Sequence, residues 1–247
     1  HSLHFSKDGD LWMAIYQKGV YVNVVNAPRF NYVGYRSNRF NSIGNKCVTS
    51  LVQTHDGNIW VSTDNGGIYG IHPDGSSIAS YPCNGNIPHS PLGLFEDSRH
   101  RVWFGSYGNG YGQIDLSTGK CSYFPIKGVA TGNTNVYAFC EDKRGKVWAA
   151  TMGNGILYFD ENAHEMVIGS NKEYLKWSCA MYYDKASDCL FVGTYGSLEM
   201  INLSSPNPFN SVKHLVSCSA VHGISAYGKH GIVISADNGL YTYNIGT

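Results

Sequence analysis

The sequence repeats one pattern six times from end to end. Each copy has an apolar strand, a polar turn that usually carries Gly, and a second strand that opens on a large apolar residue. These large residues recur every 42–48 positions. In chain order they are Trp12, Trp60, Trp103, Trp148, Phe191 and Val233. A period in the forties with several short strands in each unit is typical of a β-propeller.

Each unit is expected to form about four antiparallel strands, A to D from a central channel outward. Gly57 lies in one A–B turn, where a tight hairpin often needs a positive φ. A small residue follows two positions after each anchor, as Gly105 follows Trp103. Alternation places such a pair on one face of the sheet, where the ring and the gap suit a wedge-shaped blade.

The repeats predict one all-β domain over residues 1–247. The last unit ends after its third strand, so we expect a last blade without its outer strand and a chain that is a fragment of a larger protein. The six expected units are 1–37, 38–83, 84–125, 126–170, 171–214 and 215–247.

Composition excludes several classes of partner. Lys and Arg number 18 and so do Asp and Glu, so the chain lacks the excess positive charge that nucleic acids attract. The sequence has no apolar run of the length that crosses a bilayer, and we expect no direct membrane insertion. Seven cysteines without a Cys-x-x-Cys pair predict free, mostly buried thiols.

The sequence offers no metal, cofactor or catalytic motif. Neither His-x-His nor His-Glu-x-x-His occurs. His89 and His222 precede or begin inner strands, and we interpret them as hydrogen-bonding wall or loop residues. Asp56, Asp97 and Asp142 recur once per unit near the A–B turn, which favours turn closure by an Asx hydrogen bond over a carboxylate cluster.

The repeated unit resembles the two-component-regulator propeller repeat. It reads Asp-Gly-Asn-Ile-Trp-Val-Ser-Thr over 56–63, followed by Gly-Ile-Tyr over 67–69, and it returns over 142–158. The resemblance covers the whole chain. It is weaker where Phe191 and Val233 replace Trp, and His100 stands where the third unit should have its turn Gly.

The resemblance implies the extracytoplasmic sensor region of a hybrid two-component histidine-kinase/response-regulator protein. Such a region would lie on the periplasmic or extracellular side of a bacterial inner membrane. Its expected partners are an oligosaccharide fragment and the other domains of the parent sensor, with a homodimer also open. This chain itself is then not an enzyme, because the kinase chemistry would lie elsewhere.

Candidate ligand-binding residues gather on the B–C and D–A loops, which emerge around one mouth of the channel. Aromatic rings can cover the apolar face of a sugar, while amides and carboxylates bind its hydroxyls. Trp177 stands out because it lies outside the repeated Trp position. The predicted rim is Tyr16, Gln17, Asp64, Asn65, Tyr107, Asn109, Asn154, Trp177, Tyr195 and Asp237.

Two alternatives stay open. Propeller lyases that inactivate streptogramin antibiotics have a similar Asp-Gly-x-Ile/Leu-Trp-Phe unit, but they follow the Trp with Phe-Thr-Glu, whereas this chain has Val-Ser-Thr after Trp60. A lyase or hydrolase would also need a clustered acid and base. The other alternative is a protein-interaction scaffold or dimerisation surface without a small-molecule site.

Overall fold

The computed structural model describes residues 2–5, 11–15, 19–23, 33, 43–84, 86–130 and 134–246. Over these ranges the protein is almost entirely β-structure. The helical segments described are two short 3₁₀ turns, η1 (Glu173–Leu175) and η2 (Pro208–Asn210). Within the same ranges no helix has the length and apolar character needed to cross a membrane.

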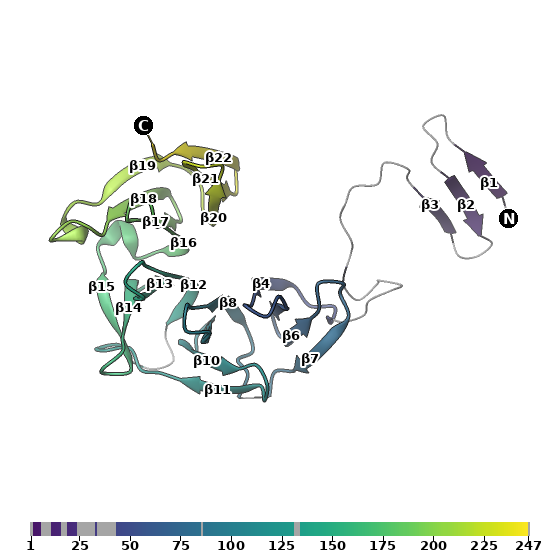
Figure 1. The fold of residues 1–247 in the computed structure, drawn as a ribbon, viewed down its shortest axis with the longest axis horizontal. Coiled ribbons are helices and arrows are strands. Elements are labelled where there is room, and N and C mark those ends of the chain that lie inside the picture. The colour runs from purple at the N-terminus through teal and green to yellow at the C-terminus, as the bar shows by residue number, and fades with distance from the viewer. Residues whose placement is uncertain are drawn as a thin grey trace.

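Five consecutive antiparallel sheets form the blades of a propeller (Figure 1). Blade I contains β4 (Val48–Gln53), β5 (Ile59–Thr63), β6 (Gly67–Ile71) and β7 (Ser77–Tyr81). Blade II contains β8 (Pro91–Glu96), β9 (Val102–Ser106), β10 (Tyr111–Asp115) and β11 (Lys120–Tyr123). Blade III contains β12 (Asn135–Glu141), β13 (Val147–Met152), β14 (Gly155–Asp160) and β15 (Glu165–Ser170).

The last two blades differ in strand number. Blade IV contains β16 (Ser178–Asp184), β17 (Cys189–Thr194), β18 (Ser197–Asn202) and β19 (Lys213–Ser217). Blade V has three strands, β20 (Val221–Tyr227), β21 (Gly231–Ala236) and β22 (Gly239–Asn244). The predicted propeller class and the missing outer strand of the last blade are confirmed.

The predicted count of six blades is wrong. Contacts between successive inner strands join β4 to β8, β8 to β12, β12 to β16 and β16 to β20, which defines five blades. The first unit instead forms a separate sheet of β1 (Ser2–Phe5), β2 (Leu11–Ile15) and β3 (Gly19–Asn23). In Figure 1 this sheet lies apart from the arc of the five blades. A repeat pattern specifies the hairpins of a unit, but it does not specify that the unit packs beside its neighbour.

The core is divided into apolar layers between neighbouring blades. Trp103 of blade II packs with Val136 and Phe139 of blade III in one such layer. A Cβ on Gly105 would clash with the backbone carbonyl of Val136, so the small residue lets the next inner strand approach closely. The predicted anchor Val233 is only half-buried, because its neighbours on β21 face the core instead.

The recurring Asp secures both the A–B turn and the anchor Trp. Asp97 accepts hydrogen bonds from the backbone N–H groups of Arg99 and Arg101, each at 3.0 Å, and from the Trp103 indole at 2.8 Å. Asp142 bonds Trp148 in the same way at 3.0 Å. The Asx interpretation is therefore confirmed for these two residues.

Asp56 does not occupy the equivalent place in blade I. Thr54 follows β4 directly, where Asp97 follows β8, and its hydroxyl donates to Asp56 Oδ1 at 2.6 Å. Asp56 also accepts from the backbone N–H of Asn58 at 3.2 Å, so it still closes its turn. The apparent match of three Asp residues therefore combines two different positions of the turn.

Ion pairs connect blades II to III and III to IV. Arg101 donates two hydrogen bonds to Glu161, at 2.8 and 2.9 Å. Arg144 makes a similar fork with Asp188, at 2.7 and 3.1 Å, and these bonds hold the pKa of the Asp188 carboxyl far below its usual range. Such bidentate pairs fix the angle between neighbouring blades as well as adding stability.

All seven cysteines are free, as predicted. Three are buried, three are half-buried and Cys47 is exposed, so the expectation that most are buried is met only in part. Burial raises the pKa of the Cys121 thiol to about 12, which leaves it almost entirely protonated and unreactive at neutral pH.

Candidate ligand-binding rim

The five inner strands surround a cavity of about 640 Å³ at the centre of the arc. Each of β4, β8, β12, β16 and β20 contributes consecutive residues to its wall. Both apolar and polar groups line it. The lining residues are 49–51, 92–94, 137–139, 179–181, 222–224 and Tyr195.

A β-bulge occurs near the start of every inner strand. The pairing with the second strand shifts between Val136 and Ala138 in blade III, and at the corresponding place in the other four blades. A bulge adds one residue and redirects its side chain. The five bulge residues all line the cavity: Thr49, Leu92, Tyr137, Cys179 and His222.

Backbone hydrogen bonds join the loops around this mouth of the channel. Some of them cross between blades, as when the N–H of Asn65 donates to the carbonyl of His89 at 2.7 Å. Gly153 makes a comparable bond to Lys176, also at 2.7 Å. Backbone hydrogen bonds therefore hold the loops of the rim together. These bonds do not use the side chains of the rim.

Three of the predicted aromatic residues of the rim lie near one another. Tyr107, Trp177 and Tyr195 are each more than half exposed. Burial raises the pKa of Tyr137, and so does its proximity to Tyr195, Cys179 and Tyr107. Tyr107 and Tyr195 thus flank Tyr137 where the channel opens. Trp177 lies immediately before β16, and its carbonyl accepts the backbone N–H of Tyr195 at 3.1 Å.

The predicted polar residues divide into two groups. Asp64 accepts a hydrogen bond from Ser90, and Asn154 donates to Thr134 at 3.1 Å, so these two side chains hold loops in place. Asn65 is exposed with a φ of 54°, a conformation that suits Asn in a turn. Asn109 is exposed and lies two positions after Tyr107 in the same loop.

Asp237 faces a bulge residue. Its carboxylate lies 2.5 Å from Nε2 of His222, and both side chains are exposed to solvent. Tyr16 and Gln17 lie outside the described residues. The structure therefore gathers Tyr107, Tyr195 and Asp237 around the cavity mouth.

Tyr137 was missed by the sequence analysis. It lies inside an inner strand, where alternation alone would place it among the packing residues. The bulge that redirects it leaves no clear signal in one unit, because Thr, Leu, Tyr, Cys and His occupy the same place in the five blades. Aligning the five inner strands and looking for the position with the least uniform chemistry could have found it.

Comparison with known protein families identifies the repeat. Residues 42–65 and 131–153 match the family described as Two component regulator propeller. Two segments of the chain therefore match the two-component-regulator propeller repeat. The two matched segments lie in the second and fourth predicted units, and the resemblance inferred from the sequence is confirmed. A search of curated proteins found no match.

Solved structures support the propeller fold of these repeats. An extracellular domain of a putative hybrid two-component system from B. thetaiotaomicron matches 98% of the chain with a TM-score of 0.72 and 19% identity. A second such domain from the same organism matches 100% of the chain with a TM-score of 0.66 and 17% identity. The chain spans 32% of the length of each of these domains.

An enzyme also shares the fold. Virginiamycin B lyase from Staphylococcus aureus matches 99% of the chain and 84% of its own length, with a TM-score of 0.61 and 16% identity. At these identities the similarity shows the fold alone. The function of the two-component-regulator propeller repeats in this chain must therefore be argued from its own side chains.

Proposed function

We propose that this chain is a ligand-recognition propeller from the extracytoplasmic region of a bacterial two-component signalling protein, and that it binds a glycan fragment across the channel mouth. The bulge residues carry the proposal. They present a phenol, a thiol, a hydroxyl, an imidazole and an apolar side chain around one cavity, with two further Tyr residues at its edge. Such a surface can stack on a sugar ring and bind its hydroxyl groups.

The proposed parent protein carries its histidine-kinase chemistry outside this chain. The other domains of that sensor are the expected protein partners, and a homodimer would bring two rims into one signalling unit. The family of the repeat and the extracellular domains that share the fold support this placement.

The direct test is a calorimetric titration of the chain with a panel of plant, host and microbial oligosaccharides. We expect one class of glycan to bind, and Tyr195→Ala and Trp177→Ala to weaken that binding at least tenfold. Tyr227→Ala is the matched control, because Tyr227 is also an exposed aromatic residue but lies at the opposite end of β20. Unchanged affinity in both rim variants would contradict the proposal.

A lyase is the second candidate function, and the His222–Asp237 pair favours it. A carboxylate beside an imidazole can orient a general base, and this pair lies at the mouth of the channel. The test is turnover of a streptogramin by the chain, followed by His222→Ala. Turnover that the variant abolishes would replace the sensor proposal, whereas no turnover would remove this candidate.

A further inference from the structure

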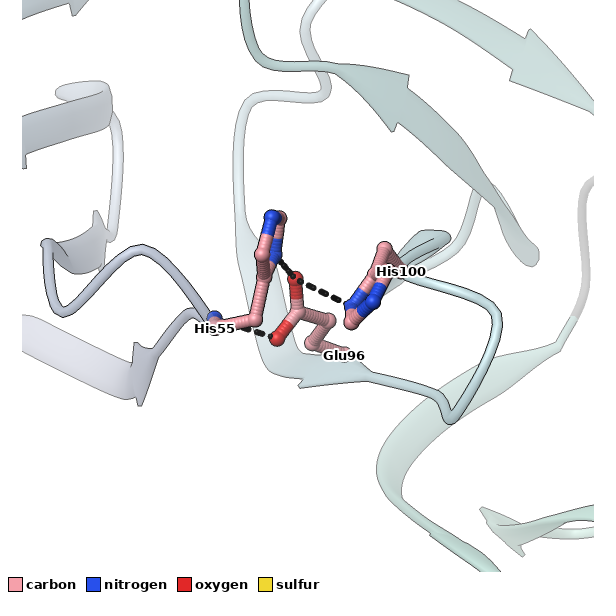
Figure 2. A group of neighbouring side chains, drawn as sticks. All are labelled: His55, Glu96 and His100. Atoms are coloured by element: carbon pink, nitrogen blue, oxygen red, sulfur yellow. Dashed lines mark hydrogen bonds and ion pairs between the residues drawn. The ribbon is translucent and has the colours of Figure 1, made fainter.

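Two histidines and a glutamate meet at the interface of blades I and II, at the opposite ends of the inner strands from the rim. Figure 2 shows His55 and His100 next to the Glu96 carboxylate, and the centroids of the two imidazole rings lie 3.9 Å apart. Nδ1 of His55 lies 2.7 Å from Glu96 Oε1, and Nδ1 of His100 lies 3.8 Å from the same oxygen. The Glu96 side chain is 11% exposed, whereas the two imidazoles are 55% and 57% exposed.

The next interface contains the same glutamate without the histidines. Glu141 ends β12 as Glu96 ends β8, and each reaches back to the A–B turn of the preceding blade. Glu96 accepts the backbone N–H of His55 at 2.8 Å, and Glu141 accepts that of Ser98 at 2.8 Å. The glutamate therefore makes the same bond at the second interface without an imidazole beside it.

His100 occupies a turn position at which other units of the repeat have glycine. His100 has a φ of 61°, and its counterpart Gly145 has a φ of 75°. A side chain in this left-handed conformation is unfavourable relative to glycine. The chain thus carries a histidine at an unfavourable backbone position, directed at the same carboxylate that a second histidine contacts.

The three side chains offer a metal-ligand set. One ligand atom from each of His55, Glu96 and His100 lies within 4.8 Å of the others. Bonds of about 2.0 Å in a tetrahedral site place ligand atoms about 3.3 Å apart. The distances of 2.7 and 3.8 Å to Glu96 Oε1 lie on either side of that value. Rotation of the two exposed imidazoles, whose ring centroids lie 3.9 Å apart, would separate the rings and equalise these distances.

We propose that His55, Glu96 and His100 bind a divalent transition metal, with Zn²⁺ as the best match. Two imidazoles and one carboxylate are a ligand set that Zn²⁺ accepts, with a fourth position left for water. Nδ1 of each His binds the ion through its lone pair, so any proton on Nδ1 is released to solvent. The ion links the A–B turn of blade I to the inner strand and A–B turn of blade II.

The surroundings leave room for the fourth ligand. A cavity of about 700 Å³ opens beside the cluster, and all three proposed ligands lie in its wall. Gln113, Ser117 and Lys120 of blade II line the same cavity. Water or a small anion can therefore reach the ion from the groove between the blades. The site shares no lining residue with the cavity at the rim.

The test is a calorimetric titration of the full chain with ZnCl₂ after treatment with a chelator. We expect one Zn²⁺ per chain. The variant His55→Ser/His100→Gly reproduces Ser98 and Gly145 of the next interface, and we expect it to lose more than the roughly 10–100-fold in affinity that loss of an outer-shell partner costs. His164→Gly is the matched control, because His164 also has a left-handed φ, of 52°, and is exposed on another turn.

Circular dichroism of the metal-free variants separates loss of ligands from loss of fold. Should the double variant fail to fold, His100→Gly alone replaces it, since glycine is favourable at that backbone position. Zn²⁺ binding that survives either folded variant, or Mg²⁺ binding as tightly as Zn²⁺, overturns the proposal. Failure of the wild-type chain to bind Zn²⁺ also overturns it.

Discussion

The interface of blades I and II and the interface of blades II and III are built on one plan with different side chains. In both, a glutamate from the later blade bonds the turn of the earlier one. The first interface adds His55 and His100 around Glu96, and the second has Ser98 and Gly145 around Glu141. The first turn starts with Thr54, whereas the second starts with Asp97, which also bonds an anchor Trp.

The comparison separates the glutamate bond that both interfaces share from the two histidines that only the first interface has. The bond from the glutamate to the neighbouring backbone is common to both interfaces and needs no histidine. The two imidazoles occur at one interface and bring no hydrogen bond that a Ser does not already provide, since the Ser98 hydroxyl donates to Glu141 at 2.7 Å. Because the shared hydrogen bond does not need the two histidines, we infer that they have a role in binding a ligand.

The largest expected effect comes from removing the carboxylate that distinguishes the second turn. Asp97→Ala leaves the Trp103 indole and the Arg101 guanidinium without their buried partner, which costs about 3–5 kcal/mol of unfolding free energy. Thr54→Ala removes one hydroxyl from the first turn and costs about 1 kcal/mol. Urea denaturation of both variants measures the contrast. Equal losses of unfolding free energy in the two variants would contradict this difference between the turns.

Transplanting the histidines tests the comparison by gain rather than loss. Ser98→His/Gly145→His would surround Glu141 with the ligands that surround Glu96, and we expect a second Zn²⁺ to bind. At 100 times its dissociation constant such an ion adds about 2.7 kcal/mol of stability. Calorimetry gives the stoichiometry. Binding of a single Zn²⁺ would show that the first interface has a feature besides its three ligands.

A smaller effect is expected from exchanging the residues that face the next blade. Gly105 in blade II takes the place of Ser62 in blade I, two positions after the anchor Trp. Gly105→Ser should cost about 1–3 kcal/mol, because its Cβ would press on the Val136 backbone. Thermal unfolding measures the loss. Gly196→Ala is the control, since a Cβ there meets no neighbouring atom within 4 Å; an equal loss in both would contradict the explanation.

The smallest effect is a pH dependence of the second interface. Hydrogen bonds from Arg101 lower the pKa of the Glu161 carboxyl below its unfolded value of about 4.3. The stabilisation is thus complete above that pH and is lost as the pH falls through the folded pKa. Glu161→Gln should cost about 0.5–1 kcal/mol at neutral pH, because the pair is partly exposed. Denaturation at neutral and acid pH should show this difference vanish, and a constant difference would contradict it.

The strands of the blades could be predicted well because residues close together in the sequence determine each strand and turn of a propeller repeat. Alternation, turn residues and the anchor Trp all lie within one unit, so strands such as β5 and β13 could be placed from a few residues each. Packing of the first unit beside the second could not be predicted in this way. The anchor of β21 was also misplaced at Val233, because a run of β-branched residues gives no preference between its two faces.

The candidate sites were predicted less completely. The exposed rings of Tyr107 and Tyr195 could be located because loops between predicted strands share one end of the channel. Tyr137 required knowledge of a bulge, which depends on pairing with the neighbouring strand. The cluster around Glu96 joins residues 41 positions apart in the chain, and no spacing motif describes that contact.

The direction of the glutamate bonds has a consequence for how the chain is made. At the two interfaces where Glu96 and Glu141 act, the inner strand of the later blade bonds the turn of the earlier blade. During synthesis the earlier blade leaves the ribosome first, and the glutamate that bonds its turn is synthesised later. At these two interfaces, the turn of the earlier blade therefore gains its glutamate bond only after the inner strand of the next blade has been made.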